Sequence, residues 1–227
     1  EVVGAARGML RLMTVAPELD GIDEVVHRLV ELGVIPCWGH SNCTLGELPR
    51  LQGVRCNITH LFNGMSPISH KQSGLALLPF LDSEVYCEVN GDGVHLNAES
   101  IRMCHRHLNP ERMILISDAV ISAGRGHGEF RYFDRRVVSS QTGVRYEDGT
   151  LIGSNCLLPE VVRRFIETTG CALHEAVRLA TLNPCRLLGI DSRRGSIESG
   201  KDADLVLLDD DLSVTRVFAG EEVPPLL

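Results

Sequence analysis

The fold is decided by a stretch near the start of the chain, Leu10-Arg11-Leu12-Met13-Thr14-Val15-Ala16, and by the segment that follows it. The short apolar run predicts a buried strand. Apolar residues at helical spacing within residues 22–32 then predict a helix that stops at Gly33. Strand and helix in steady alternation are typical of a parallel sheet covered by helices, so the chain is predicted to be an α/β protein.

The same alternation continues toward the middle of the chain. Further strands are predicted at residues 34–38, 54–58, 85–89 and 113–117, and further helices at residues 45–51 and 98–107. About five strands of a parallel sheet can therefore be counted before the pattern changes.

The pattern changes after Asp118, where a glycine-rich segment leads into short strand-like pieces. These pieces predict a β-rich insertion over about residues 124–150. Helices are expected again at residues 159–168 and 173–181, and Asn183-Pro184 is expected to break the helical pattern. We predict a catalytic domain over residues 9–190 and a small appended β unit over residues 195–223.

Composition excludes several classes of protein. The chain has 227 residues, of which 44% are hydrophobic and 23% charged, and this balance excludes disorder. The formal charge of -8 gives no basic field, so we expect no nucleic-acid partner and no anionic membrane partner. No apolar run or N-terminal signal pattern predicts membrane insertion or export, and a cytoplasmic location is expected. The eight cysteines form no CxxC pair, which favours buried reduced thiols.

Polar side chains follow four successive predicted strands. The stretches are Trp38-Gly39-His40-Ser41, Asn57-Ile58-Thr59-His60, Asn90-Gly91-Asp92-Gly93-Val94-His95 and Ile116-Ser117-Asp118. In a parallel α/β barrel, side chains at strand ends point into a shared mouth. Two imidazoles with a carboxylate suit Zn²⁺ or a similar ion that keeps a water position open, so we predict a metal site of this type.

The other histidines carry weaker signals. His105 and His107 are two residues apart near a helix end and are expected to be exposed. His27, His127 and His174 lie in helical or glycine-rich stretches and receive no role.

Several motifs, in this order, resemble the N-acetylglucosamine-6-phosphate deacetylase family of the amidohydrolase superfamily. They are Thr14-Val15-Ala16-Pro17-Glu18, Gly39-His40-Ser41-Asn42-Cys43-Thr44, Thr59-His60-Leu61-Phe62-Asn63-Gly64-Met65, Asp92-Gly93-Val94-His95, Ser117-Asp118-Ala119, Gly149-Thr150-Leu151-Ile152-Gly153-Ser154, Ala180-Thr181-Leu182-Asn183-Pro184 and Gly200-Lys201-Asp202-Ala203-Asp204-Leu205. The resemblance runs from about Met9 to the end of the chain. It implies a (β/α)₈ TIM-barrel-type fold whose N-terminal strands are absent from this chain.

The resemblance also implies roles for individual residues. His40 and His60 are expected to bind one divalent metal ion, most readily Zn²⁺, with Fe²⁺, Co²⁺ or Mn²⁺ as alternatives, that lowers the pKa of a water molecule. Asp118 is expected to act as general base and then as general acid. Substrate contacts are expected from His95, from Asn63 and Gly64 toward the phosphorylated sugar, and from Leu151, Ile152 and Gly153 on the acetamide side.

Two departures from the family pattern affect the expected function. The family has an arginine that grips the substrate phosphate, often from a neighbouring subunit, whereas this chain has Lys71 in the corresponding stretch. The family's third metal ligand, a glutamate in a His-Leu-Glu-Gly-Pro-Phe-like stretch, has no counterpart, and Glu1 is not assigned as that ligand. A complete barrel needs roughly 250 residues, so we expect this chain to hold only the later part of the site and to be inactive or nearly so on its own.

The expected reaction is metal-dependent hydrolysis of N-acetylglucosamine 6-phosphate to glucosamine 6-phosphate and acetate, in a homodimer with a shared phosphate site. One alternative is an amidohydrolase for another N-acyl sugar or an N-acyl amino acid. The other is a non-catalytic homologue that binds sugar phosphate or a partner chain.

Overall fold

The computed structural model describes residues 2–49 and 53–222, which divide into two compact units. Unit 1 contains the described residues up to 89 together with residues 107–114. Unit 2 contains residues 90–106 and the described residues from 115 onward. The expectations for Glu1, for the end of the helix predicted over 45–51 and for residue 223 fall outside the described residues.

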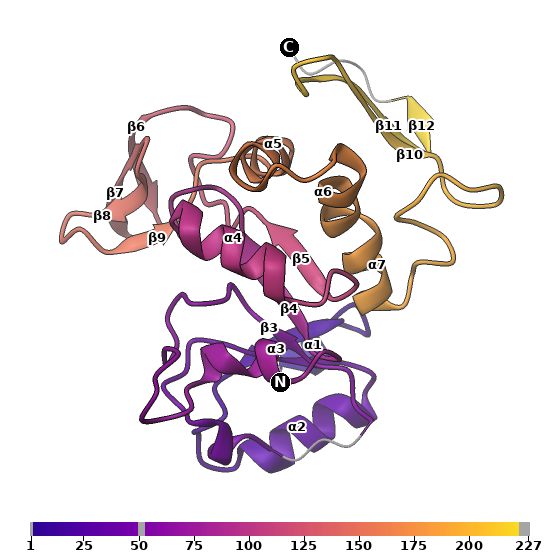
Figure 1. Cartoon of the computed structure of the whole chain (residues 1–227). Helices are drawn as coiled ribbons and strands as arrows, with labels where there is room; N and C mark the ends of the chain where they lie inside the picture. The colour runs from indigo at the N-terminus through magenta and orange to yellow at the C-terminus, as the bar shows by residue number, and fades with distance from the viewer. Residues whose placement is uncertain (1, 50–52, 223–227) are drawn as a thin grey trace. The chain divides into compact units, whose positions relative to one another are not determined.

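A five-stranded parallel sheet organises unit 1 (Figure 1). Its strands follow the order β1-β2-β3-β4-β5 and comprise β1 (Leu12–Val15), β2 (Ile35–Trp38), β3 (Asn57–Ile58), β4 (Tyr86–Asn90) and β5 (Met113–Ile116). Each of the first three strands pairs in parallel with the next, as in the register Trp38↔Ile58. Strands that are neighbours in the sequence are thus neighbours in the sheet, in agreement with the predicted α/β fold.

The helices of unit 1 are short, except for one amphipathic helix. They are α1 (Val2–Ala5), α2 (Ile22–Glu31) and α3 (Leu78–Leu81), with 3₁₀ turns at Leu45–Glu47 and Leu75–Leu77. Helix α2 buries Val26 and Leu29, and it contacts β2. The longer helix predicted from residue 45 is wrong, because Leu48 precedes Pro49 and adopts an extended backbone with ψ 134°.

The first strand is less buried than its sequence suggests. The prediction of a buried strand over residues 10–16 is wrong in burial, since β1 covers only Leu12–Val15 and none of its residues is buried. β1 stands first in the described sheet order, so one of its edges pairs with no described strand.

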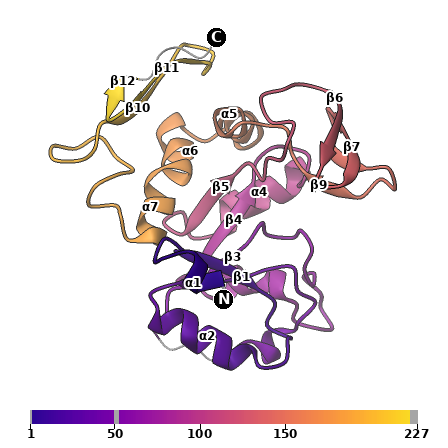
Figure 2. The same ribbon diagram turned by 180° about the vertical axis from the view of Figure 1, so that it is seen from behind.

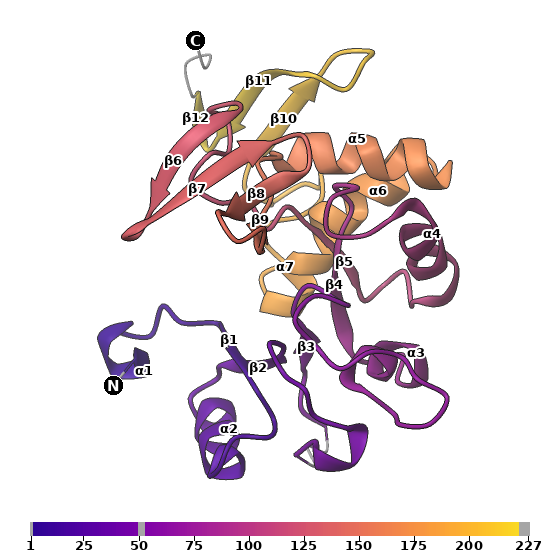
Figure 3. The ribbon, with the colours of Figure 1, turned by 90° about the vertical axis from the view of Figure 1, so that its left-hand side faces the viewer.

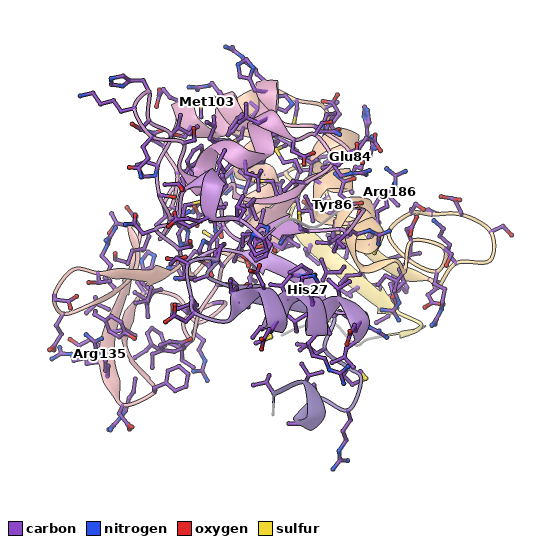
Figure 4. All side chains as sticks on the ribbon, turned by 90° about the horizontal axis from the view of Figure 1, so that it is seen from below. His27, Glu84, Tyr86, Met103, Arg135 and Arg186 are labelled. Carbon is purple, nitrogen blue, oxygen red and sulfur yellow. The ribbon has the colours of Figure 1, made fainter. Side chains whose placement is uncertain are left out.

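A side-chain contact also joins residues near β4 and β5. Arg112 donates to the carboxylate of Glu84 (3.1 Å) and to the hydroxyl of Tyr86 (3.3 Å), and both acceptor residues are labelled in Figure 4.

Unit 2 contains the β-rich insertion as a separate antiparallel sheet (Figure 3). Its strands follow the order β6-β7-β8-β9 and comprise β6 (Gly128–Tyr132), β7 (Arg135–Ser140), β8 (Gly143–Tyr146) and β9 (Leu151–Gly153). Gly143 has φ 92°, and a Cβ atom there would lie 2.7 Å from side-chain carbons of both Leu151 and Val94. Only glycine therefore fits this close approach at the start of β8.

The helices of unit 2 are α4 (Ala98–His107, whose last residue belongs to unit 1), α5 (Leu158–Thr169), α6 (Leu173–Ala180) and α7 (Leu182–Leu188). The expectation that Asn183-Pro184 breaks the helical pattern is wrong, because both residues lie within α7. The break occurs at Thr181, and Pro184 is tolerated because the first turn of a helix needs no backbone N–H donor.

The C-terminal segment forms a three-stranded antiparallel sheet, β10 (Asp204–Leu208), β11 (Val214–Ala219) and β12 (Glu221–Glu222), in that order (Figure 2). The division into domains at about residues 190–195 stays a prediction. Among the described residues, no helix has the length and apolar character needed to cross a membrane.

The cysteines agree with the prediction of buried thiols. All eight are free, and six are buried. Burial raises the pKa of Cys37 to about 12, and it does the same for Cys104. These thiols therefore carry no appreciable thiolate at neutral pH.

Candidate active site

Three predicted site residues share an uncommon backbone conformation. His40, His60 and Asp118 have φ values of 48°, 33° and 45°, in the left-handed region that residues other than glycine seldom adopt. Each of them closely follows a strand, namely β2, β3 and β5. Strained backbone of this kind persists only where surrounding contacts hold it, and it clusters at functional sites.

The two histidines of unit 1 converge on each other. Their Nε2 atoms are 2.7 Å apart, and the rings meet edge to face with centroids 4.5 Å apart. β2 and β3 are parallel, with Trp38 opposite Ile58, so the residues that follow both strands emerge at the same edge. His60 is 7% exposed.

Gly39 permits this convergence. A Cβ atom at this position would lie 2.9 Å from the Cβ of Thr59 and 3.2 Å from the Cγ2 of Thr14. The backbone that leads into His40 can therefore pass close to Thr59 only without a side chain.

Glu18 anchors the loop that carries His40. Its carboxylate accepts a hydrogen bond from the Ser41 hydroxyl (2.6 Å) and another from the Asn42 backbone N–H (2.8 Å). Burial acts to raise the pKa of Glu18, but these hydrogen bonds outweigh it and lower the pKa. The carboxylate is therefore charged at neutral pH and holds the two residues that follow His40.

Glu88 of β4 supports His60 in a similar way. Its carboxylate accepts from the amide of Asn57 (2.7 Å) and from the backbone N–H of His60 (3.3 Å). The backbone carbonyl of Glu88 accepts from Leu61 (2.9 Å). Contacts on both sides of His60 thus fix the end of β3.

Unit 2 holds a second group, in which one histidine lies between two carboxylates. His95 Nδ1 is 2.6 Å from Asp92 Oδ2, and His95 Nε2 is 3.2 Å from Asp118 Oδ2. Asp92 is fully buried and also accepts from the backbone N–H groups of Val94 (2.9 Å) and His95 (3.0 Å). Arg164 of α5 donates to the backbone carbonyl of Asp92 (2.6 Å).

This arrangement shifts the pKa values of both buried partners. Burial acts to lower the pKa of His95, but hydrogen bonds and charge from Asp118 and Asp92 outweigh it and raise the pKa to about 9. Burial likewise acts to raise the pKa of Asp92, and the contacts with His95 and Val94 reverse that effect. His95 is therefore an imidazolium at neutral pH.

The residues expected to line the acetamide side lie beside Asp118. The backbone carbonyl of Asp118 accepts from Ser154 N–H (2.8 Å), and Ser154 Oγ donates to the carbonyl of Ser117 (2.6 Å). A Cβ atom on Gly153 would lie 2.6 Å from that same carbonyl oxygen of Asp118. Strand β9, which is formed by Leu151, Ile152 and Gly153, thus ends next to the predicted acid–base residue.

The residues expected near the sugar phosphate lie in unit 1. Asn63 donates its side-chain amide to the carbonyls of His60 (3.2 Å) and Leu61 (3.1 Å), so part of its role is to fix this turn. Gly64 has φ 55°, and a Cβ atom there would lie 3.3 Å from His40 Nδ1. Lys71 is exposed.

The imidazoles of His40 and His60 can supply two ligands to a divalent ion. Both imidazoles direct Nε2 to a common point, and two nitrogens on one zinc ion sit roughly 3.3 Å apart, so a small separation of the rings admits the ion. Within the described residues of unit 1, no third His, Cys, Asp or Glu brings a ligand atom into the same group. A catalytic zinc ion normally has three protein ligands, so His40 and His60 supply part of the set.

Sequence reasoning missed the supporting carboxylates. Glu18 and Asp92 stand inside quoted motifs, yet neither received a role, and Glu88 lay in a strand with no motif. The spacing Asp92-Gly93-Val94-His95 was a usable signal, because a carboxylate three residues before a histidine can bond both its ring and its backbone.

The sequence model of a protein family, the amidohydrolase family, matches residues 53–223 of this chain. The chain belongs to the amidohydrolase family. Family membership agrees with the parallel sheet and with the predicted barrel-type fold.

Similar proteins carry deacetylase names. The chain is 35% identical to N-acetylglucosamine-6-phosphate deacetylase of Bos taurus, over 94% of this chain and 54% of the bovine protein. It is also 35% identical to N-acetylgalactosamine-6-phosphate deacetylase of Shewanella sp. (strain ANA-3), over 93% of this chain and 54% of that protein. The chain thus spans about half the length of these relatives.

A solved structure gives the same result for the fold. The N-acetyl-D-glucosamine-6-phosphate deacetylase of Mycobacterium smegmatis, solved as a mutant in complex with N-acetyl-D-glucosamine-6-phosphate, superimposes with a TM-score of 0.87 at 33% identity. The match covers 97% of this chain and 59% of that one. The resemblance stated from the motifs is therefore confirmed.

Proposed function

We propose that this chain carries the metal-binding histidines and the acid–base carboxylate of a deacetylase. The reaction is hydrolysis of N-acetylglucosamine 6-phosphate to glucosamine 6-phosphate and acetate. The observation that carries the proposal is the convergence of His40 and His60 through their Nε2 atoms, each from a left-handed position after a strand. We assign this pair and Asp118 to the same reaction because the motifs that contain them follow one another in the order found in the family.

The residues divide the work as follows. His40 and His60 hold a divalent ion, Zn²⁺ foremost, with Fe²⁺, Co²⁺ or Mn²⁺ as alternatives. When bound, that ion would act as a Lewis acid and lower the pKa of a water molecule, so that hydroxide is available near neutral pH. Asp118 takes a proton from the attacking water and returns it to the amine as the C–N bond breaks, which yields acetate and a free amino group.

Residues around Asp118 orient it and the substrate. In the free protein, His95 holds the Asp118 carboxylate through Nε2, and Asp92 fixes the other side of the His95 ring. We assign His95 to a contact with the sugar, and Leu151, Ile152 and Gly153 to the acetamide side. His95 Nε2, 3.2 Å from Asp118 Oδ2, thus lies where it orients the proposed general base.

The residues that we assign to the substrate phosphate lie in unit 1. We assign Asn63, Gly64 and Lys71 to the phosphorylated sugar, and we place the protein in the cytoplasm as a homodimer with a shared phosphate site. Lysine supplies a point charge without the bidentate fork of arginine, so phosphate binding should be weaker than in relatives that use arginine.

An acetate-release assay with added Zn²⁺ tests the reaction in a complete protein that contains this chain, because His40 and His60 supply only part of the metal ligands. We expect Asp118→Asn to abolish turnover without loss of folding, whereas Asp134→Asn, at the exposed tip between β6 and β7, should leave turnover unchanged. Turnover retained in Asp118→Asn would contradict the role of Asp118. No acetate release from the unsubstituted complete protein would favour the alternative of a non-catalytic homologue that binds sugar phosphate or a partner chain.

A second substrate is supported by one observation. The relative from Shewanella, at 35% identity, is named for N-acetylgalactosamine 6-phosphate. Comparing kcat/KM for both phosphorylated sugars and for unphosphorylated N-acetylglucosamine separates the candidates. A strong preference for phosphorylated sugars supports a phosphate site, and equal use of the unphosphorylated sugar points to an amidohydrolase for another N-acyl compound.

A further inference from the structure

Unit 2 contains a group of donor side chains that includes none of the residues assigned to hydrolysis. His105 lies in α4, Cys171 lies between α5 and α6, and Glu175 lies in the first turn of α6. Their ligand atoms, an imidazole nitrogen, a thiol sulfur and a carboxylate oxygen, all lie within 4.8 Å of one another. In the described part of the chain, no other three such side chains come together this closely.

Two contacts fix His105 against α5. Arg102, one helical turn earlier, donates from Nε to the backbone carbonyl of Thr168 (2.9 Å). The ring of His105 meets the fully buried ring of Phe165 edge to face, with centroids 5.6 Å apart at 87°. His105 is therefore half-buried and oriented, which corrects the expectation that it is an exposed side chain like His107.

The backbone around Cys171 is held just as firmly. Gly170, with φ 73°, ends α5 and donates to the carbonyl of Ile166 (2.8 Å). The hydroxyl of Thr169 accepts from the backbone N–H of Cys171 (3.3 Å) and donates to the carbonyl of Phe165 (2.8 Å). Cys171 as a whole is buried, with 9% of its surface exposed.

Glu175 is fixed through one of its two oxygens. Its Oε2 accepts from the backbone N–H of Ala172 (3.0 Å), which caps α6. A carboxylate has four acceptor sites, so an ion can bind it without displacing this bond. The three donors thus come from segments that other contacts already hold in place.

We propose that His105, Cys171 and Glu175 bind Zn²⁺ or a closely similar divalent ion. Thiolate, imidazole and carboxylate are the donors that zinc prefers, at about 2.3, 2.0–2.1 and 2.0–2.2 Å. Neighbouring donors in such a tetrahedron sit roughly 3.5 Å apart, so side-chain rotations that close the group by about 1 Å suffice. Water completes the fourth position.

Ion binding would cross-link the end of α4 to the start of α6. The thiol gives up its proton when the sulfur–metal bond forms, so one proton is released to solvent for each ion bound. Thiolate and carboxylate together balance the charge of the ion, which a histidine pair alone does not. Ion binding at this site does not depend on the proposed deacetylation.

Cobalt titration of the full chain, reduced and free of oxygen, tests the site. Co²⁺ replaces Zn²⁺ readily, and a thiolate ligand produces a near-ultraviolet charge-transfer band that two imidazoles cannot produce. We expect this band to saturate at one equivalent and to vanish in Cys171→Ser. His105→Ala and Glu175→Gln should weaken the apparent affinity by about tenfold or more.

Matched controls separate this site from other thiols and histidines. His107→Ala and His174→Ala change exposed histidines next to the site, and Cys43→Ser changes a thiol near the His40–His60 pair; all three should keep the band. A band that is absent from the unsubstituted chain, or that survives in Cys171→Ser, would overturn the proposal. If Cys171→Ser does not fold by circular dichroism, unchanged affinity in His105→Ala and Glu175→Gln would overturn it instead.

Discussion

The fully buried carboxylate of Asp92 accepts three hydrogen bonds, so its replacement by asparagine tests the histidine–carboxylate group directly. The pKa of His95 is raised from its ordinary value of 6.5 to about 9. That difference corresponds to about 3 kcal/mol of stability. Because the folded-state pKa is the higher one, this stability is fully present below pH 6.5 and is lost as the pH rises to 9.

Asp118 and Asp92 both raise the pKa of His95, so Asp92→Asn should lower this pKa toward 6.5. We expect the pH-dependent loss of stability between pH 6.5 and 9 to fall clearly below about 3 kcal/mol. At pH 6 the free energy of unfolding of the variant should be about 3 kcal/mol lower. A neutral asparagine amide cannot accept the same three hydrogen bonds and carries no negative charge to compensate the buried imidazolium.

Denaturant unfolding at several pH values measures these free energies, and NMR titration of the His95 ring measures its pKa. Asp82→Asn is the matched control, since the carboxylate of exposed Asp82 accepts from the backbone N–H of Glu84 (2.9 Å) and, among the described residues, faces no histidine bond of this kind. A pKa of His95 that stays near 9 in Asp92→Asn would refute the reasoning. An unchanged pH dependence of stability would refute it as well.

Three further substitutions probe other parts of the chain. Gly153→Ala must displace the Asp118 carbonyl, which lies 2.6 Å from the new Cβ, and should lower acetate release by about 100-fold in the kinetic assay. Phe165→Ala empties a fully buried position and should lower the free energy of unfolding by about 4 kcal/mol in denaturant titration; a loss below 1 kcal/mol would contradict the assigned packing. Glu18→Gln weakens the bond from Ser41 and should lower zinc affinity about tenfold by calorimetry, with little change in the melting temperature.

Much of the sheet could be predicted from the sequence, because most of its strands are short apolar runs. The run at residues 113–117, for example, appears as β5 (Met113–Ile116). The sequence was less informative where one residue decides a boundary. Pro49 follows the 3₁₀ turn Leu45–Glu47 and prevents a longer helix, whereas Pro184 lies in the first turn of α7. A proline is tolerated in the first turn of a helix and disfavoured further along it.

The site was readable where its residues follow strands. His40 and His60 could be paired in advance, because parallel neighbouring strands end at one edge. The carboxylates that hold them could not be predicted. Glu18, for example, lies in the segment after β1 and contacts Ser41, which is 23 residues away in the sequence. His105 was misjudged because its burial depends on Phe165, which is distant in sequence.

The left-handed backbone at His40, His60 and Asp118 has an evolutionary consequence. Glycine or asparagine tolerates that conformation better than histidine or aspartate, so substitutions at these three positions relieve a cost that the native chain bears. A library of this chain selected only for resistance to heat would therefore enrich such replacements, and its most stable members would have lost their chemistry.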